Sequence, residues 1–334
     1  MPDKGSRRVE VRKAQSLGKS SLGITIPKAW ASSIGVEPGS PVYLELRDDG
    51  ILIRSMGREA VRTSSIHVMS SSTVDEVLRM VISSYLRGDE SMIIKFDAVN
   101  PSVKEHLFRS IKVKLAGVEL IEESPAEAHV KVLSLQTQLP LGKLMSRMWL
   151  TVRGMLRDSL DLIGNSDGEL AEDVTARDDE VDKTYLLIHR LINMAIAGTI
   201  QLKSVSLENR MELTPYLLVA KSVERSGDHA WRIAQWAPNL VLAGPAIGAI
   251  KELGFKVLEL SNAALNAFIG KDTEIAMKIL NQRNVLLNER MEAMTSMHDV
   301  PADSRGFALL VIESLGRIAA YAFDIAETTL DGYS

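Results

Sequence analysis

The chain has 334 residues, 46% of them hydrophobic and 25% charged, with a net charge of −4 at pH 7 and no cysteine. This length exceeds what one hydrophobic core usually organises, so we expect two or three domains. The absence of cysteine excludes disulfides, thiolate metal sites and a cysteine nucleophile. The longest apolar run, residues 239–250, is broken by Gly and Pro, and no secretory signal is visible. We therefore expect a cytoplasmic protein with no membrane insertion.

A basic segment opens the chain, because residues 1–28 carry seven basic side chains against two acidic ones. Alternating apolar residues predict short half-buried strands, and Pro27 predicts the first turn of a short helix. The predicted strands cover residues 8–13, 22–26, 41–47 and 50–54. So small a sheet buries little apolar surface alone, which indicates a dimer whose paired basic stripes contact DNA phosphates. The alternative is a disordered basic tail beside solvated strands.

Alternating strand and helix patterns follow the basic segment. The strands are predicted at 66–69, 91–96, 117–122 and 129–135, and the helices at 73–87 and 101–115. This β-α-β-α-β-β order indicates a small α/β domain that ends near residue 140.

Helical periodicity alone continues from residue 141 to the end. The helices are predicted at 142–163, 168–202, 211–236, 246–269, 271–298 and 302–330. Residues 217–230 align with 309–322 at an offset of 92, and residues 177–182 align with 283–288 at an offset of 106. The sequence therefore predicts two tandem three-helix units produced by duplication.

Paired carboxylates stand out in the first of these units. Asp178 and Asp182 are four residues apart, as are Glu224 and Asp228, so each pair shares a helix face. If the two helices pack antiparallel, four carboxylates converge into a site suited to a divalent cation. The alternative is a pair of solvated acidic helix faces.

The second unit differs at every matching position. Uncharged residues replace the four carboxylates there, namely Asn284, Asn288, Gly316 and Ala320. We therefore expect a metal at the first unit only. Motifs of phosphate-binding loops, zinc proteases, serine hydrolases and di-iron bundles are all missing from the sequence, so we expect no enzymatic activity.

Residues 8–54 resemble the AbrB/SpoVT swapped-hairpin DNA-binding fold, in its archaeal variant. The segments RKAQ (12–15), LGITIPKAW (22–30) and IGVEPGS (34–40) carry the resemblance. It implies that two chains interlace their hairpins into a homodimer through this domain. It also implies DNA contacts by five basic residues, namely Arg8, Arg12, Lys13, Lys19 and Lys28.

Residues 141–332 resemble the PhoU family of phosphate-uptake regulators. The motifs RDDEVD (177–182) and VERSGDHA (223–230) carry this resemblance. It implies two tandem three-helix bundles whose acidic clusters bind iron, zinc or another divalent metal, and a role in restraining phosphate import. The second unit departs from the family pattern because it lacks the carboxylates, whereas residues 61–140 resemble no family that we can name.

Together these observations predict a multidomain α+β protein. Its domains are an AbrB/SpoVT-like domain at 1–60, a small α/β domain at 61–140, and PhoU-like bundles at 141–238 and 239–334. The predicted function is that of a homodimeric, DNA-binding and metal-binding regulator of phosphate uptake. One alternative is an adaptor that binds the ATPase subunit of the phosphate ABC transporter and uses its N-terminal domain only for dimerisation. Another is a bundle enzyme with a di-metal centre.

Overall fold

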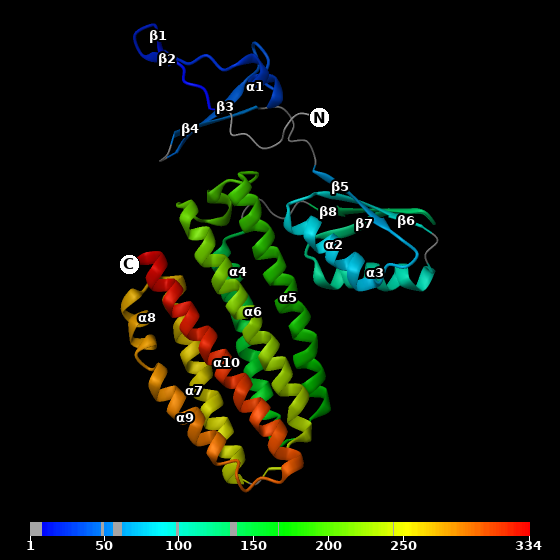
Figure 1. Cartoon of the computed structure of the whole chain (residues 1–334), viewed down its shortest axis with the longest axis vertical. Coiled ribbons are helices and arrows are strands. Elements are labelled where there is room, and N and C mark those ends of the chain that lie inside the picture. The colour runs from blue at the N-terminus through cyan, green and yellow to red at the C-terminus, as the bar shows by residue number, and fades with distance from the viewer. Residues whose placement is uncertain are drawn as a thin grey trace. The chain divides into compact units, whose positions relative to one another are not determined.

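The structure is a computed structural model that describes residues 9–47, 50–55, 62–97, 100–133, 139–165, 167–242 and 244–334. The chain divides into two compact units, Met1–Val61 and Arg62–Ser334, which are described separately. The fold class is confirmed, because small β elements near the N-terminus precede an α/β domain and a long helical region (Figure 1).

The N-terminal unit consists of two short hairpins and one helix. Strands β1 (Gln15–Leu17) and β2 (Ser21–Gly23) pair antiparallel, as do β3 (Val42–Arg47) and β4 (Gly50–Ser55), with α1 (Lys28–Ser33) between the hairpins. The strands predicted over 8–13 and up to residue 26 are wrong in the described part, since residues 9–14 and 24–27 form no strand. Alternating residues form a strand only where a neighbouring edge offers hydrogen bonds, and this hairpin offers none to them.

The second unit begins with a small α/β domain. Its elements are β5 (Thr63–Val68), α2 (Val74–Leu86), β6 (Ser91–Phe96), α3 (Pro101–Lys114), β7 (Val118–Glu123) and β8 (Glu127–Val132). The sheet order is β5-β6-β8-β7, in which β5 and β6 are parallel and the other neighbours antiparallel. A capping box between Thr73 and Glu76 fixes the start of α2. The observed element order is the predicted one.

The helical region follows within the same unit. Its long helices are α4 (Leu141–Asp161), α5 (Gly168–Ala197), α6 (Leu213–Trp236), α7 (Gly244–Gly270), α8 (Thr273–Leu280), α9 (Arg283–Thr295) and α10 (Ala302–Tyr333). Short 3-10 turns lie at Leu202–Val205, Arg210–Glu212 and Ala237–Asn239. The single helix predicted over 271–298 is therefore wrong, because two helices, α8 and α9, occupy that stretch. Helix α5 ends before the predicted residue 202, since Gly198 adopts the left-handed conformation that closes helices.

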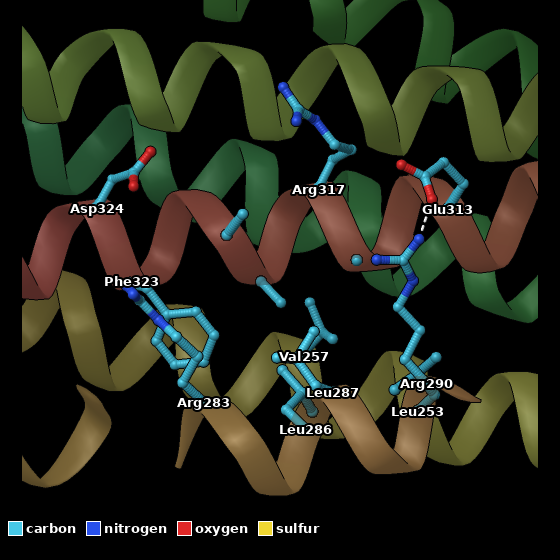
Figure 2. Close-up of a pocket in the computed structure, with 13 residues that line it drawn as sticks. Leu253, Val257, Arg283, Leu286, Leu287, Arg290, Glu313, Arg317, Phe323 and Asp324 are labelled. Atoms are coloured by element: carbon cyan, nitrogen blue, oxygen red, sulfur yellow. Dashed lines mark hydrogen bonds and ion pairs between the residues drawn. The ribbon is translucent and has the colours of Figure 1, made fainter. Parts of the chain in front are cut away.

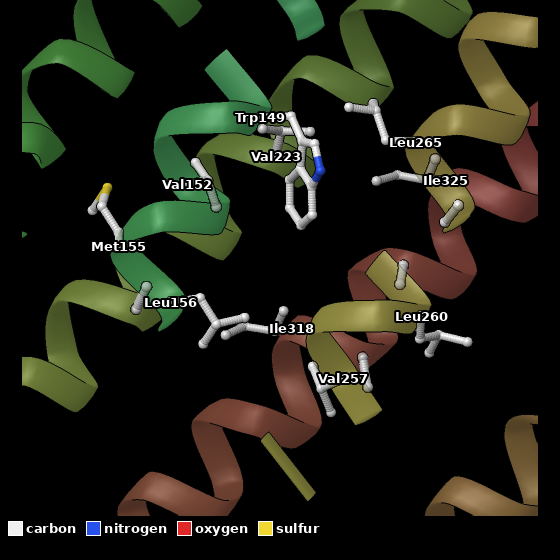
Figure 3. Packing of buried hydrophobic residues seen from close by; sticks show 14 of the residues in the cluster. Trp149, Val152, Met155, Leu156, Val223, Val257, Leu260, Leu265, Ile318 and Ile325 are labelled. Carbon is white, nitrogen blue, oxygen red and sulfur yellow. The ribbon is translucent and has the colours of Figure 1, made fainter. Parts of the chain in front are cut away.

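The two sets of helices share one hydrophobic core. Figure 3 shows Trp149 and Leu156 of α4 beside Val257 of α7 and Ile318 of α10. The Trp149 indole also donates a hydrogen bond of 3.0 Å to Asn262 Oδ1 on α7. Each set therefore completes the core of the other.

One helix in the described part of the chain, α10, is long and apolar enough to cross a membrane by length and composition. However, 56% of its apolar stretch is buried against other helices. It packs mainly on α6 and α7, as the core helix of a bundle does.

Candidate functional site

The four carboxylates predicted from sequence lie together between α5 and α6. One oxygen from each of Asp182, Glu224 and Asp228 lies within 4.8 Å of the others. A glycine lets the helices approach here, because a Cβ at Gly227 would lie 3.3 Å from Val181 Cγ1 and 3.8 Å from Asp178 Oδ1. Among the described residues this is the one group of His, Asp and Glu side chains close enough to share a metal ion.

Asp178 lies at the edge of this group, one helical turn before Asp182. Burial, reinforced by the charges of Asp182 and Asp228, raises the pKa of Asp178 to about 7. Its Oδ1 atom is buried and has no hydrogen-bond partner. A buried carboxylate oxygen without a partner is costly, so this corner of the site favours a cation.

Burial also raises the pKa values of Glu224 and Asp228, the two carboxylates on α6. Burial raises the pKa of Glu224, against the lowering effect of a hydrogen bond from Lys221. Burial and the charge of Asp182 also raise the pKa of Asp228. Glu224 Oε2 is buried and unpartnered, like Asp178 Oδ1. The protein thus supplies more acceptor atoms here than donors.

Two lysines partly neutralise the cluster, and the sequence reasoning missed both. Lys221 Nζ lies 2.6 Å from Glu224 Oε1, and Lys114 Nζ lies 3.1 Å from Asp182 Oδ2 and 3.7 Å from Asp179 Oδ1. The spacing of three residues between Lys221 and Glu224 was a visible signal. No sequence pattern indicated Lys114, because it lies on α3 of the α/β domain, 68 residues before Asp182 in the sequence.

The contact of Lys114 is part of a larger junction between the α/β domain and α5. The buried side chain of Arg190 on α5 donates hydrogen bonds to the backbone carbonyls of Tyr85 and Asp89 and stacks on the Tyr85 ring. Asn193, one turn further, donates to the carbonyl of Leu86 at 2.9 Å. Helix α5 therefore carries carboxylates of the cluster and also anchors the α/β domain.

The second set of helices places a cation where the first set places a carboxylate. Gly316 of α10 matches Glu224, and a Cβ at Gly316 would lie 2.8 Å from Arg290 Nε. Arg290 reaches across from α9 and pairs with Glu313 of α10 (Figure 2). Its guanidinium places a positive charge beside Gly316, the position that matches Glu224.

Four of the five basic residues predicted to contact DNA, Arg12, Lys13, Lys19 and Lys28, are exposed on the N-terminal unit. Lys13, Lys19 and Lys28 are exposed and have no ion pair within the described residues, and Lys19 lies in the turn between β1 and β2. Arg12 is paired with Glu10. Arg8 lies outside the described residues. Three of the five predicted side chains are therefore free to meet an anion.

Comparison with known families matches both parts of the chain. Residues 145–237, which contain all four carboxylates, match the PhoU domain. Residues 15–60 match the family described as antidote-toxin recognition MazE, bacterial antitoxin. The chain therefore contains a PhoU domain behind a MazE-type, AbrB-like domain. Both resemblances drawn from the sequence are confirmed, whereas the archaeal origin stays a prediction.

Individual relatives agree with these matches. Phosphate-specific transport system accessory protein PhoU homologs from two strains of Caulobacter vibrioides are 37% identical over 95 residues, which is 28% of this chain. The chain spans 38% of the length of these relatives.

Two solved PhoU structures are similar to this chain, and one of them has a TM-score above 0.5. The crystal structure of PhoU from Pseudomonas aeruginosa matches 57% of this chain and 93% of its own, with 21% identity and a TM-score of 0.51. The regulatory protein PhoU from Streptococcus pneumoniae matches at 17% identity over 57% of this chain and 91% of its own, with a TM-score of 0.48. The likeness to the Pseudomonas protein identifies a PhoU-type helical fold.

Proposed function

We propose that this protein is a homodimeric regulator of phosphate uptake that binds DNA through its N-terminal unit and a metal ion through its PhoU domain. The observation that carries the proposal is the carboxylate cluster between α5 and α6, with its two buried and unpartnered oxygens. The proposal assigns no catalytic residue. DNA binding and contact with a transport system would both place the protein in the cytoplasm.

The metal site would consist of Asp182, Glu224 and Asp228, with Asp178 as a fourth ligand. Carboxylate oxygens suit hard and borderline ions, so iron, zinc or a similar divalent ion fits this set. The unpartnered oxygens of Asp178 and Glu224 support this assignment because an ion would satisfy them. When bound, the ion would supply positive charge that holds α5 and α6 together.

Metal binding would also affect the contact between α5 and the α/β domain. A cation shared by Asp182 and its neighbours would compete with Lys114 for the Asp182 carboxylate. Loss of that ion pair would weaken one of the contacts that hold α3 on α5. We propose this competition as the route by which metal occupancy influences the α/β domain.

The N-terminal unit supports dimerisation because no described side chain in it is buried. Apolar residues remain open to solvent there, among them Ile24 (64% exposed), Leu44 (67%) and Leu46 (84%). Such a segment needs a partner to form a core. We propose a second copy of the same chain, whose hairpins would offer edges to the unpaired segments 9–14 and 24–27.

A dimer would place two sets of Lys13, Lys19 and Lys28 on one particle. Lysine contacts with phosphates give an affinity for DNA that falls steeply with salt concentration. The test is fluorescence anisotropy with duplex DNA from upstream of the gene for this protein, at 50–200 mM salt. We expect a steep negative salt slope for the full chain, and a shallower slope with weaker binding for the Lys13→Ala/Lys19→Ala variant. Lys143→Ala, on the surface of α4, is the control.

The names of the relatives favour a second candidate function. A phosphate-specific transport system accessory protein suggests that this chain contacts the ATPase subunit of a phosphate transporter. In that case the N-terminal unit would serve only for dimerisation. Absence of DNA binding at low salt, together with co-purification of the ATPase, would support the adaptor and contradict the DNA-binding regulator.

A further inference from the structure

A surface hollow of about 440 Å³ lies along the seam between α6 and α10, beside the carboxylate cluster. Helix α6 lines it with Arg225, His229 and Arg232, and α10 lines it with Glu313, Arg317 and Tyr321. Successive lining residues are four and three positions apart on α6 and four positions apart on α10. Each set therefore lies on one face of its helix. Two helices therefore contribute one continuous polar lining.

The internal repeat relates the two sides of this hollow. Arg225 and Arg317 are equivalent at the offset of 92, and so are His229 and Tyr321. The two guanidinium carbons lie 6.0 and 5.5 Å from the centre of the same Tyr321 ring. The duplication thus brings a pair of equivalent arginines together at the junction of the two helical sets.

None of the three arginines of the hollow forms an ion pair within the described residues, although the charges of Arg225 and Arg232 act on Asp228 and those of Arg225 and Arg317 act on Asp324. Within the described ranges, no carboxylate oxygen lies within 4.0 Å of the guanidinium nitrogens of Arg225, Arg232 or Arg317. Other arginines nearby are paired, as Arg283 is with Glu327 at 2.7 Å. Unpaired guanidinium groups that line a concave surface attract anions.

Two carboxylates also line the hollow, and one of them, Glu313, is paired with another arginine. Glu313 is engaged by Arg290, which approaches from α9, while Arg317 extends from α10 on the opposite side, toward α6 (Figure 2). Asp228 belongs to the carboxylate cluster between α5 and α6. Positive charge therefore exceeds negative charge in the hollow, because three guanidinium groups face two carboxylates, one of which is already paired with Arg290.

We propose that this hollow binds a phosphate group, held by Arg225, Arg232 and Arg317. Guanidinium groups bind tetrahedral oxyanions through paired N–H donors, more specifically than a point charge does. Asp228 at the rim discriminates among such anions: hydrogen phosphate carries an O–H that can donate to a carboxylate, whereas sulfate carries none. Free phosphate and a small phosphate monoester share this chemistry. The three arginines are not proposed metal ligands, whereas Asp228 is, so the test is made on the metal-free chain, in which the Asp228 carboxylate is available to the anion.

The test measures binding of radiolabelled inorganic phosphate to the full chain by equilibrium dialysis. A chelator is present so that phosphate cannot bind through a metal, and ionic strength is constant. We expect saturable binding that weakens at least tenfold in Arg225→Gln and in Arg317→Gln. Arg153→Gln removes the same charge from an exposed position on α4 outside the hollow, and we expect less than a twofold change.

Three further measurements complete the test. Arg317→Lys keeps the charge but removes the forked donors, so we expect intermediate affinity. Sulfate should compete at least tenfold more weakly than phosphate, and competition by glycerol phosphate shows whether an ester binds more tightly than the free ion. Non-saturable binding, equal competition by sulfate, or an equal loss in Arg153→Gln would overturn the proposal. Because the metal is removed, none of these outcomes depends on metal occupancy, and a chain without a metal site could still bind phosphate through the arginines.

Discussion

Lys114 and Asp182 form an ion pair between the α/β domain and α5, with Nζ 3.1 Å from Oδ2. Lys114 ends α3 of the α/β domain, and Asp182 is a proposed metal ligand on α5. Burial lowers the pKa of Lys114, but hydrogen bonding and attraction to Asp182 outweigh it and raise the pKa overall. The lysine therefore stays charged near neutral pH and occupies a carboxylate that a metal would use.

Removal of this competing charge should strengthen metal binding. We expect Lys114→Ala to raise affinity for a divalent ion by roughly two- to fivefold, which is the range for a partly exposed ion pair. A chelator-dye competition titration measures the change. Lys112→Ala, an exposed lysine on the same helix, is the control and should leave affinity unchanged. Equal affinities in Lys114→Ala and the unaltered chain would contradict the competition.

The metal itself is tested by elemental analysis of the purified protein. We expect Asp182→Asn/Glu224→Gln to lose the bound ion, because the two substitutions remove charged ligands from both helices. Glu180→Gln removes an exposed carboxylate from α5 outside the cluster and should retain the ion. Unchanged metal content in the double variant would eliminate the site.

The raised pKa of Asp178 predicts how stability depends on pH. Its ordinary pKa is 3.8 and its folded value is about 7, so the folded protein binds more protons between these values. Stability of the chelator-treated protein should therefore fall as pH rises through this window. Asp178→Asn should reduce this slope, measured as the difference in melting temperature between pH 5 and pH 8. Parallel slopes for the two proteins would contradict the assignment.

Metal binding should respond to pH in the opposite direction, because ligands must release protons to bind an ion. We expect the increase in melting temperature on adding metal to be larger at pH 8 than at pH 6. Asp182→Asn/Glu224→Gln should show no such increase at either pH.

Two glycines on α7 should differ in their response to alanine. A Cβ at Gly254 would lie 2.3 Å from Leu160 Cδ2 in the shared core, whereas Gly248 has no atom that near. We expect Gly254→Ala to lower the free energy of unfolding by about 1–3 kcal/mol through overpacking. Gly248→Ala should raise it by up to about 1 kcal/mol through helix propensity. Chemical denaturation measures both, and equal effects would contradict close packing of α7 on α4.

The oligomeric state of the chain tests whether the N-terminal unit needs a second copy to form a hydrophobic core. We expect light scattering to give a dimer mass for the full chain. Leu44→Asp/Leu46→Asp should shift it toward monomer, because charges then occupy the apolar strand β3. Leu150→Asp, at an exposed leucine on α4, is the control. A monomeric unaltered chain would contradict the proposed dimer.

Local patterns in the sequence predicted most elements of the second unit, including the start of α2 at the capping residue Thr73. The proximity of the carboxylates was predicted from the four-residue spacing within each pair and from antiparallel packing of the two helices that carry them. The split near residue 281 was not predictable, since helical periodicity continues there without Gly or Pro. Lys114 could not be found either, because its proximity to Asp182 depends on how the α/β domain packs on α5.

The single core shared by the two helical sets has an evolutionary consequence. After a gene duplication, a half that loses its ligands is usually free to decay. Here Leu156 of the first set of helices and Ile318 of the second belong to one hydrophobic core. Loss of either set would therefore expose apolar side chains of the other. The half that lacks carboxylates at the four matching positions therefore keeps a structural role, because it completes the core of the half that has them.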